Sequence, residues 1–290
     1  MSRQKHRILL YHRIVPDDCP TLFVAMLRGE LVTQRIFYQQ LLWLKKRYRV
    51  VDLPTLLENR SSVEPMAAIT FDDGLADNLH LALPVLQQLL IPATIFVIYG
   101  SIGRRGFHHH QVARFVSSEG KHAAMSVVDG IHKPRDQLKA VLLHLGEFPD
   151  DKLAQSYANV SGTCHEDRFL DDDELRHLDQ AGVSIQSHTI SHTPLSCLAG
   201  DRLKSELLDS KHGLEELLGK QVDYLAYPVG REPDFDVNSM AAALAAGYTA
   251  AFTSLSGAVD QHTEIWKIPR LGTRNSVGKL KRKLRPLFPF

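Results

Sequence analysis

The chain has few cysteines, almost no net charge and no long hydrophobic run. Its three cysteines, Cys19, Cys164 and Cys197, are widely spaced and odd in number, which argues against a disulfide framework or a zinc cluster and favours a reducing compartment. The formal net charge of +1 gives no reason to expect nucleic-acid binding. No segment approaches the roughly 18 apolar residues of a membrane span.

The first residues of the chain also lack the pattern of a secretory signal. The apolar run from Ile8 to Tyr11 is too short for the core of a signal peptide. We therefore expect a cytoplasmic protein. The apolar and charged fractions are ordinary for a globular chain, and 290 residues suffice for one large α/β domain.

Predicted strands and helices alternate along the chain. Strand-like runs occupy residues 7–12, 49–53, 66–71, 93–98, 183–187, 223–227, 248–254 and 265–270. Helical spacing of apolar residues occurs at 33–47, 75–90, 171–180, 201–218 and 238–246. This alternation favours parallel strands joined by helical crossovers.

Two adjacent carboxylates end one of these strands. The apolar run that starts at Met66 leads into Asp72, Asp73 and Gly74. Neighbouring strand residues point to opposite sides, so one carboxylate can hold a metal while the other moves protons. Taken alone, a strand entering a polar turn is the commoner explanation.

Two histidines follow a second strand. His188 and His192 come after the run that starts at Val183, and one turn of helix would place both imidazoles on one face. Two histidines and one carboxylate form a known ligand set for a catalytic metal that keeps an open position. Surface histidines are the alternative in a chain with fifteen of them.

Together these segments resemble the polysaccharide deacetylases (carbohydrate esterase family 4, the NodB homology domain). Thr70–Gly74 and His188–His192 are similar to the first two motifs of that family, and Tyr227–Gly230 resembles the third. The likeness runs from about residue 7 to residue 272. It implies an α/β fold, a distorted (β/α)7 barrel spanning residues 1–278, with an inserted segment of helices and loops at about 100–170.

The first strand refines the resemblance. It ends in Tyr11 and His12, as in the circularly permuted subgroup that resembles the poly-N-acetylglucosamine deacetylases, where the catalytic histidine lies on this strand. The chain departs from the family before the third motif, where Ala226 precedes Tyr227 and residues 223–225 before it offer no cation. Arg270 ends another strand-like run and is a candidate substitute, although a structural role is equally open. Tyr227 and Arg270 are the expected substrate-binding residues.

The resemblance implies roles for the motif residues. Asp73, His188 and His192 are expected to hold a divalent metal, with zinc as the first choice. Asp72 is expected to act as general base, and His12 as the acid that protonates the leaving amine. The implied reaction removes an N-acetyl group from an N-acetylhexosamine in a glycan or glycan precursor, in surface-polysaccharide synthesis. The alternatives are a non-catalytic glycan-binding barrel and a metal-dependent amidase acting on a small non-sugar amide.

The C-terminal residues 279–290 contain five basic residues, no acid, and interleaved Leu and Phe. Such a basic and hydrophobic tail suits an anionic membrane surface, and a frayed, solvated tail is the alternative. With the expected cytoplasmic location, this tail favours a lipid-linked glycan precursor as substrate and peripheral contact with the inner face of the membrane.

Overall fold

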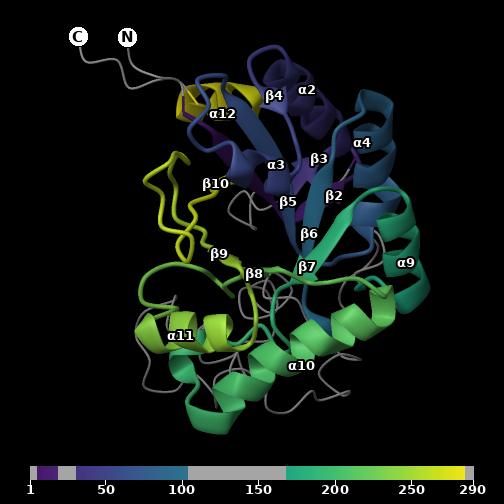
Figure 1. Cartoon of the computed structure of the whole chain (residues 1–290). Helices are drawn as coiled ribbons and strands as arrows, with labels where there is room; N and C mark the ends of the chain where they lie inside the picture. The colour runs from purple at the N-terminus through teal and green to yellow at the C-terminus, as the bar shows by residue number, and fades with distance from the viewer. Residues whose placement is uncertain (1–4, 19–30, 104–167, 285–290) are drawn as a thin grey trace, which may run out of the picture.

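A computed structural model gives the fold (Figure 1). It describes residues 5–18, 31–103 and 168–284. Most of the expected insertion, Cys19, Cys164 and the last residues of the tail lie outside this part. No helix in the described part is long and apolar enough to span a membrane.

A parallel sheet forms the centre of the molecule. In order across it lie β10 (Leu271–Gly272), β1 (Arg7–Tyr11), β5 (Met66–Asp73), β6 (Ala93–Val97), β7 (Ser184–Ser187), β8 (Tyr224–Ala226) and β9 (Ala250–Phe252), with β4 (Arg49–Val50) beside β5. Every pairing in this sheet is parallel, as the alternation of elements predicted. All C-terminal strand ends in this sheet therefore lie at one edge, which we call the C-terminal edge.

The two ends of the sheet are linked by one segment near the C-terminus. On one side, the Ile268 N–H donates to Ala251 O over 3.0 Å and the Thr253 N–H donates to Ile268 O over 2.9 Å. A few residues later, Leu271 pairs with Leu9 of β1. The sheet thus curls into the predicted distorted (β/α) barrel. We predicted a strand at 265–270, but only an isolated bridge at Ile268 and the short β10 are formed.

Helices pack around the outside of the curled sheet (Figure 1). The α-helices are α2 (Gln34–Lys45), α3 (Leu53–Glu58), α4 (Leu83–Leu89), α9 (Asp172–Gln180), α10 (Gly200–Leu218), α11 (Val237–Ala245) and α12 (Val277–Leu284). Shorter turns are η1 (Asn78–Ala82), η2 (Tyr99–Ser101) and η3 (Leu195–Cys197). The helix predicted at 75–90 is divided, because a π-helical turn, η1, precedes α4, and Pro84 lies in the first turn of α4 rather than at a kink.

Alternate residues of β5 face two different hydrophobic clusters. Met66 and Ala68 contribute to a cluster shared with Phe96 and Phe252 of neighbouring strands, which fills the concave side of the sheet. Ala67 and the other alternate residues join the larger cluster beneath the helices. Burial on both faces explains why β5 is apolar along nearly its whole length.

Two short elements were not predicted. β2 (Arg13–Val15) and β3 (Leu31–Thr33) form a small parallel sheet of their own, directly after His12. A final helix, α12, contains the first part of the expected tail, so the predicted boundary at residue 278 falls inside a helix. Leu280 and Leu284 are 1% and 3% exposed and pack into the main core, which anchors α12 against α2.

Candidate active site

The Asp72-Asp73-Gly74 turn ends β5 at the C-terminal edge. Asp72 and Asp73 pair with Phe96 and Val97 of β6, and both carboxylates are buried. Asp73 and Gly74 have φ angles of +80° and +77°. A Cβ atom at Gly74 would lie 3.1 Å from the Val97 side chain, so both the backbone angle and the space favour glycine here. The sharp exit from the strand keeps the Asp73 carboxylate at the end of the sheet.

His188 and His192 follow β7, but no helix joins them. The helical spacing that we predicted is wrong, because residues 188–192 form an irregular loop in which Thr189 and His192 have φ angles of +68° and +59°. Side chains other than glycine rarely adopt such angles, and this kind of strain clusters at functional sites. The loop nevertheless brings the two rings together, with centroids 4.8 Å apart.

A buried glutamate on α10 holds this loop. One carboxylate oxygen of Glu206 accepts hydrogen bonds from the Ile190 N–H over 3.0 Å, the Ser191 N–H over 2.6 Å and the Ser191 hydroxyl over 2.9 Å. Glu206 is only 7% exposed. It therefore fixes the backbone between the two histidines and offsets part of the strain of the loop.

Asp73, His188 and His192 form a compact group in which a metal ion fits. Their ligand atoms all lie within 4.8 Å of one another. Asp73 Oδ1 lies 3.7 Å from His188 Nε2 and 3.6 Å from His192 Nε2. Ligands about 2.1 Å from a tetrahedral zinc ion are roughly 3.4 Å apart, close to these separations.

The hydrogen bond of His188 also suits a metal ligand. Its Nδ1–H donates to Ala226 O of β8 over 2.8 Å, which leaves Nε2 as the nitrogen facing Asp73. Metal-binding histidines are commonly oriented in this way by a partner on the other ring nitrogen. Burial lowers the pKa of His188 more than the attraction of Asp72 and Asp73 raises it, so the neutral form that binds metals is favoured.

Asp72 is paired with Arg270 and lies beside the metal group, with its Oδ2 3.8 Å from His188 Nε2. Arg270 donates to both carboxylate oxygens, over 2.6 Å and 2.7 Å, and its Nε–H donates to Thr253 O over 3.0 Å. Burial pushes the pKa of Asp72 upward, but the attraction of Arg270, His188 and His12 outweighs it and holds the pKa below its usual range. Asp72 is therefore ionised at neutral pH.

Arg270 supplies the charge that the third motif lacks. It lies in the segment that links the ends of the sheet, and its side chain is fully buried above Phe96, with the guanidinium carbon 5.2 Å from the ring centroid. Its described contacts are to protein groups. This placement matches the role of substitute partner for Asp72, while direct substrate binding by Arg270 stays a prediction.

His12 lies between β1 and β2 at the same edge. Its backbone carbonyl accepts a hydrogen bond from Asn78 over 3.0 Å, and the next residue, Arg13, forms a buried ion pair with Asp77 over 2.8 Å. Asp77 also accepts from the Ile14 N–H over 3.1 Å. The turn after Asp73 thus clamps the chain on both sides of His12.

Tyr227 has a more structural setting than predicted. It is 1% exposed, its hydroxyl donates to Trp266 O over 3.1 Å, and its ring stacks on Phe235 at 4.4 Å. Its N–H donates to Phe252 O over 3.0 Å. Substrate contact by the Tyr227 side chain stays a prediction. Val229, two residues on, has a φ angle of +61°, a rare value for a β-branched residue.

Glu206 was not predicted from the sequence, although the sequence contains a weak signal for it. Leu203, Leu207 and Leu214 follow the buried face of α10, and Glu206 interrupts that face. A carboxylate at a core position of an amphipathic helix requires a partner, which here is the histidine loop.

Known proteins resemble this chain in sequence and in fold. A sequence profile of the polysaccharide deacetylases matches residues 59–251. YxkH of Bacillus subtilis (strain 168), whose name places it provisionally among the polysaccharide deacetylases, is 26% identical over 216 residues. That alignment covers 74% of this chain and 54% of YxkH, so the chain spans about half the length of this relative.

Solved structures share the fold. The Streptococcus pyogenes deacetylase PplD, in complex with acetate, matches with a TM-score of 0.66 and 20% identity, over 97% of this chain and 99% of that one. IcaB from Ammonifex degensii matches with a TM-score of 0.65 and 18% identity, over 98% of each chain.

Proposed function

We propose that this chain, which belongs to the polysaccharide deacetylase family, is a metal-dependent hydrolase that removes the N-acetyl group from an N-acetylhexosamine in a glycan. The observation that carries the proposal is the buried group of Asp73, His188 and His192, beside the ionised Asp72. PplD, which has the same fold, was solved with acetate, the acid that such a reaction releases.

Asp73, His188 and His192 would hold the metal, and zinc is the first choice for this ligand set. When bound, the ion lowers the pKa of a water and polarises the substrate carbonyl. Asp72 accepts the proton from the attacking water, because it is ionised and its carboxylate plane is fixed by Arg270. We propose that a backbone N–H near Tyr227 binds the developing oxyanion. The N–H of Tyr227 itself does not serve, because it donates to Phe252 O.

His12 is proposed to protonate the leaving amine. Amines leave poorly unless they are protonated, so an acid must be present near the scissile bond. The clamp formed by Asp77 and Asn78 holds the His12 backbone at the C-terminal edge. The proposed proton acceptor, Asp72, thus lies on β5, and the proposed proton donor lies in the link between β1 and β2.

Replacing His12 with Ala should lower the turnover of N-acetyl amides by about 10²-fold or more while sparing activated acetyl esters, whose leaving groups need little protonation. Steady-state rates on an N-acetylated sugar and on 4-nitrophenyl acetate would measure this. An equal loss on both substrates would instead show that His12 has a packing role.

The substrate is proposed to be a glycan or glycan precursor used in surface-polysaccharide synthesis. Acetate release from a panel of N-acetylated sugars and oligosaccharides, with and without a chelator, tests this. We expect release that stops with chelator and returns with added zinc. Binding without release would favour a non-catalytic glycan-binding barrel, and release only from small non-sugar amides would favour the amidase.

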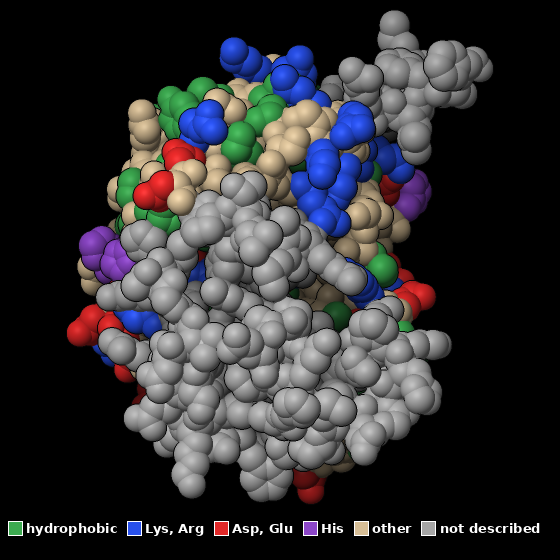
Figure 2. Space-filling model, turned by 180° about the vertical axis from the view of Figure 1, so that it is seen from behind, with side chains coloured by type: hydrophobic (Ala, Val, Ile, Leu, Met, Phe, Trp, Pro, Cys, Tyr) green, Lys and Arg blue, Asp and Glu red, His purple; other side chains and the backbone are tan. Residues whose placement is uncertain are grey.

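Contact with an anionic membrane, on its cytoplasmic face, belongs to the same proposal. α12 and α2 pack together and neither contains an acidic residue. Lysines and arginines gather on the upper part of the face in Figure 2, where these helices lie. Such a surface attracts anionic lipid and supports a lipid-linked precursor as substrate.

A further inference from the structure

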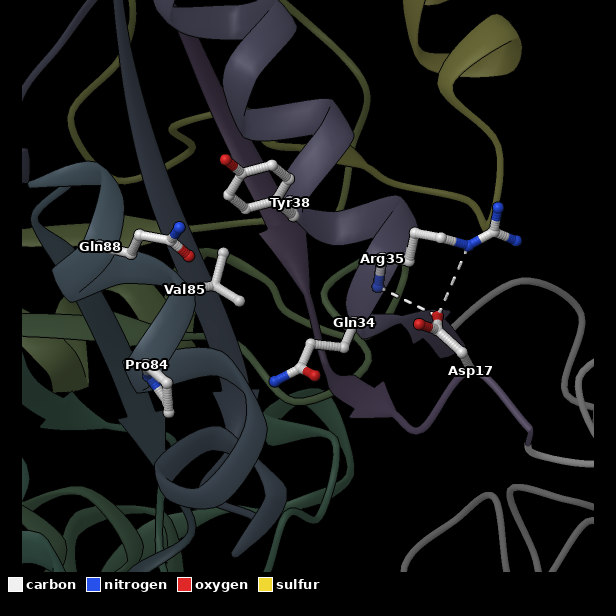
Figure 3. A pocket seen from close by; sticks show the side chains of 7 residues that line it. All are labelled: Asp17, Gln34, Arg35, Tyr38, Pro84, Val85 and Gln88. Carbon is white, nitrogen blue, oxygen red and sulfur yellow. Dashed lines mark hydrogen bonds and ion pairs between the residues drawn. The ribbon is translucent and has the colours of Figure 1, made fainter.

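An open groove lies between α2 and α4 (Figure 3), and neither Asp73 nor the two histidines line it. Its volume is about 350 Å³, at the lower end of the range for small-molecule sites. The groove is lined by Asp17, Gln34, Arg35, Tyr38, Pro84, Val85 and Gln88.

The direction of the two helices places one end of this groove toward the C-terminal edge, while Gln88, in the last turn of α4, lies toward the other end. α2 begins directly after β3 and ends shortly before β4, whose Arg49 pairs with Met66 at the start of β5. α4 follows the end of β5 and precedes the start of β6. Both helices therefore run back along the sheet, and their first turns lie toward the edge that carries Asp72.

The groove is also close to the site along the chain. Asp17 lies five residues after His12. At no more than about 3.6 Å per residue, their Cα atoms are separated by at most about 18 Å. A linear glycan of a few units that reaches the metal group can therefore extend to the rim of the groove.

The chemistry of the groove fits a neutral, polyhydroxylated ligand. Asp17 accepts a hydrogen bond from the Arg35 N–H over 3.1 Å, and the two side chains are 4.0 Å apart, so their charges offset each other. Among the lining residues, the half-buried ring of Tyr38 and the exposed Pro84 offer apolar surface to a sugar ring (Figure 3). Gln88 offers an amide to hydroxyl groups.

One polar side chain of the groove is held in place before any ligand binds. The Gln34 amide donates to Leu81 O of η1 over 2.9 Å, which fixes the side chain across the gap between the helices. A preorganised group loses less conformational entropy on binding.

We propose that this groove is an accessory saccharide subsite, which holds units of the glycan chain a few residues from the N-acetyl group that is removed. This inference rests on the proposed function, and it assigns to that function an oligomeric or polymeric substrate rather than a single sugar. The subsite would contribute to binding and leave the chemical step unchanged.

Equilibrium binding of N-acetylglucosamine and of its β-linked hexasaccharide, measured by calorimetry, tests the subsite. Tyr38→Ala and Gln88→Ala should each weaken hexasaccharide binding, Tyr38→Ala by about tenfold, and leave the monosaccharide unaffected. Gln39→Ala and Gln87→Ala are the matched controls, because these exposed neighbours on the same helices do not line the groove. They should bind both sugars like the unmodified protein. Where acetate is released, the groove variants should raise KM for the hexasaccharide without changing kcat.

Three results would overturn the subsite: unchanged hexasaccharide binding in both groove variants, an equal loss for the monosaccharide, or no binding of the hexasaccharide to the unmodified protein. Gln88 is exposed, so its replacement keeps the test independent of folding. The two proposals fail separately. If acetate is released but Tyr38→Ala and Gln88→Ala bind the hexasaccharide normally, only the subsite is rejected. If these variants weaken hexasaccharide binding but the unmodified protein releases no acetate, only the hydrolase is rejected.

Discussion

Replacing Asp72 with Asn is expected to reduce deacetylation by about 10²-fold or more while the protein keeps its metal. The amide cannot accept the proton of the attacking water, yet Asp73, His188 and His192 remain in place as ligands. Turnover on an N-acetylated oligosaccharide and metal content by atomic emission would be measured on the same preparation.

Asp73→Asn is the matched comparison, because it makes the same chemical change one residue away. This variant should lose most of its metal, and activity should return in part only at high metal concentration. If Asp72→Asn lost the metal and Asp73→Asn retained it, the two carboxylates would have the opposite roles.

Replacing Arg270 with Met is expected to destabilise the fold by about 3–5 kcal/mol, since it leaves the buried charge of Asp72 without its partner. Arg270 and Asp72 are both almost fully buried and form two charge-assisted hydrogen bonds. The free energy of unfolding, measured by urea denaturation, would report the change.

The double variant, Asp72→Asn with Arg270→Met, distinguishes the lost pair from lost packing. It should recover part of the stability, because no uncompensated charge remains. If the double variant were as unstable as the sum of the single variants, the packing of Arg270 on Phe96 would account for the loss.

Acid should weaken the same pair in the unmodified protein. The fold holds the pKa of Asp72 below its usual value. The stabilisation that the ionised Asp72 gives the fold is therefore complete when the pH is above that usual value. The contribution is lost as the pH falls toward the lowered pKa. In Arg270→Met this part of the acid dependence should be absent.

The sequence predicted much of the site because its chemistry lies at strand ends. Polar groups that directly follow apolar runs, such as Asp72, Asp73 and His188, meet wherever parallel strands end at a common edge. Arg270 could be proposed for the same reason, since it follows a strand-like run. Its pairing with Asp72 depends on how the sheet curls, and this cannot be predicted from the local spacing of residues in the sequence.

Features made by distant segments could not be predicted. The histidine loop is irregular because a carboxylate on α10, Glu206, replaces the hydrogen bonds that a helix would have supplied. The burial of Leu280 and Leu284 depends on α2, more than two hundred residues earlier in the chain. The charge of residues 279–290 was read correctly, but charge alone does not show that two leucines one helical turn apart pack into a core.

The origin of Arg270 has a consequence for the order in which the protein becomes active. The general base that we propose comes from a strand near the start of the chain, and its positive partner leaves the ribosome about two hundred residues later, together with the segment that joins β9 to β1. A nascent or C-terminally shortened chain therefore carries Asp72 without compensation. The buried carboxylate, oriented by two hydrogen bonds from Arg270, can form only after nearly the whole polypeptide has been made, so completion of synthesis and assembly of the proposed base are one event.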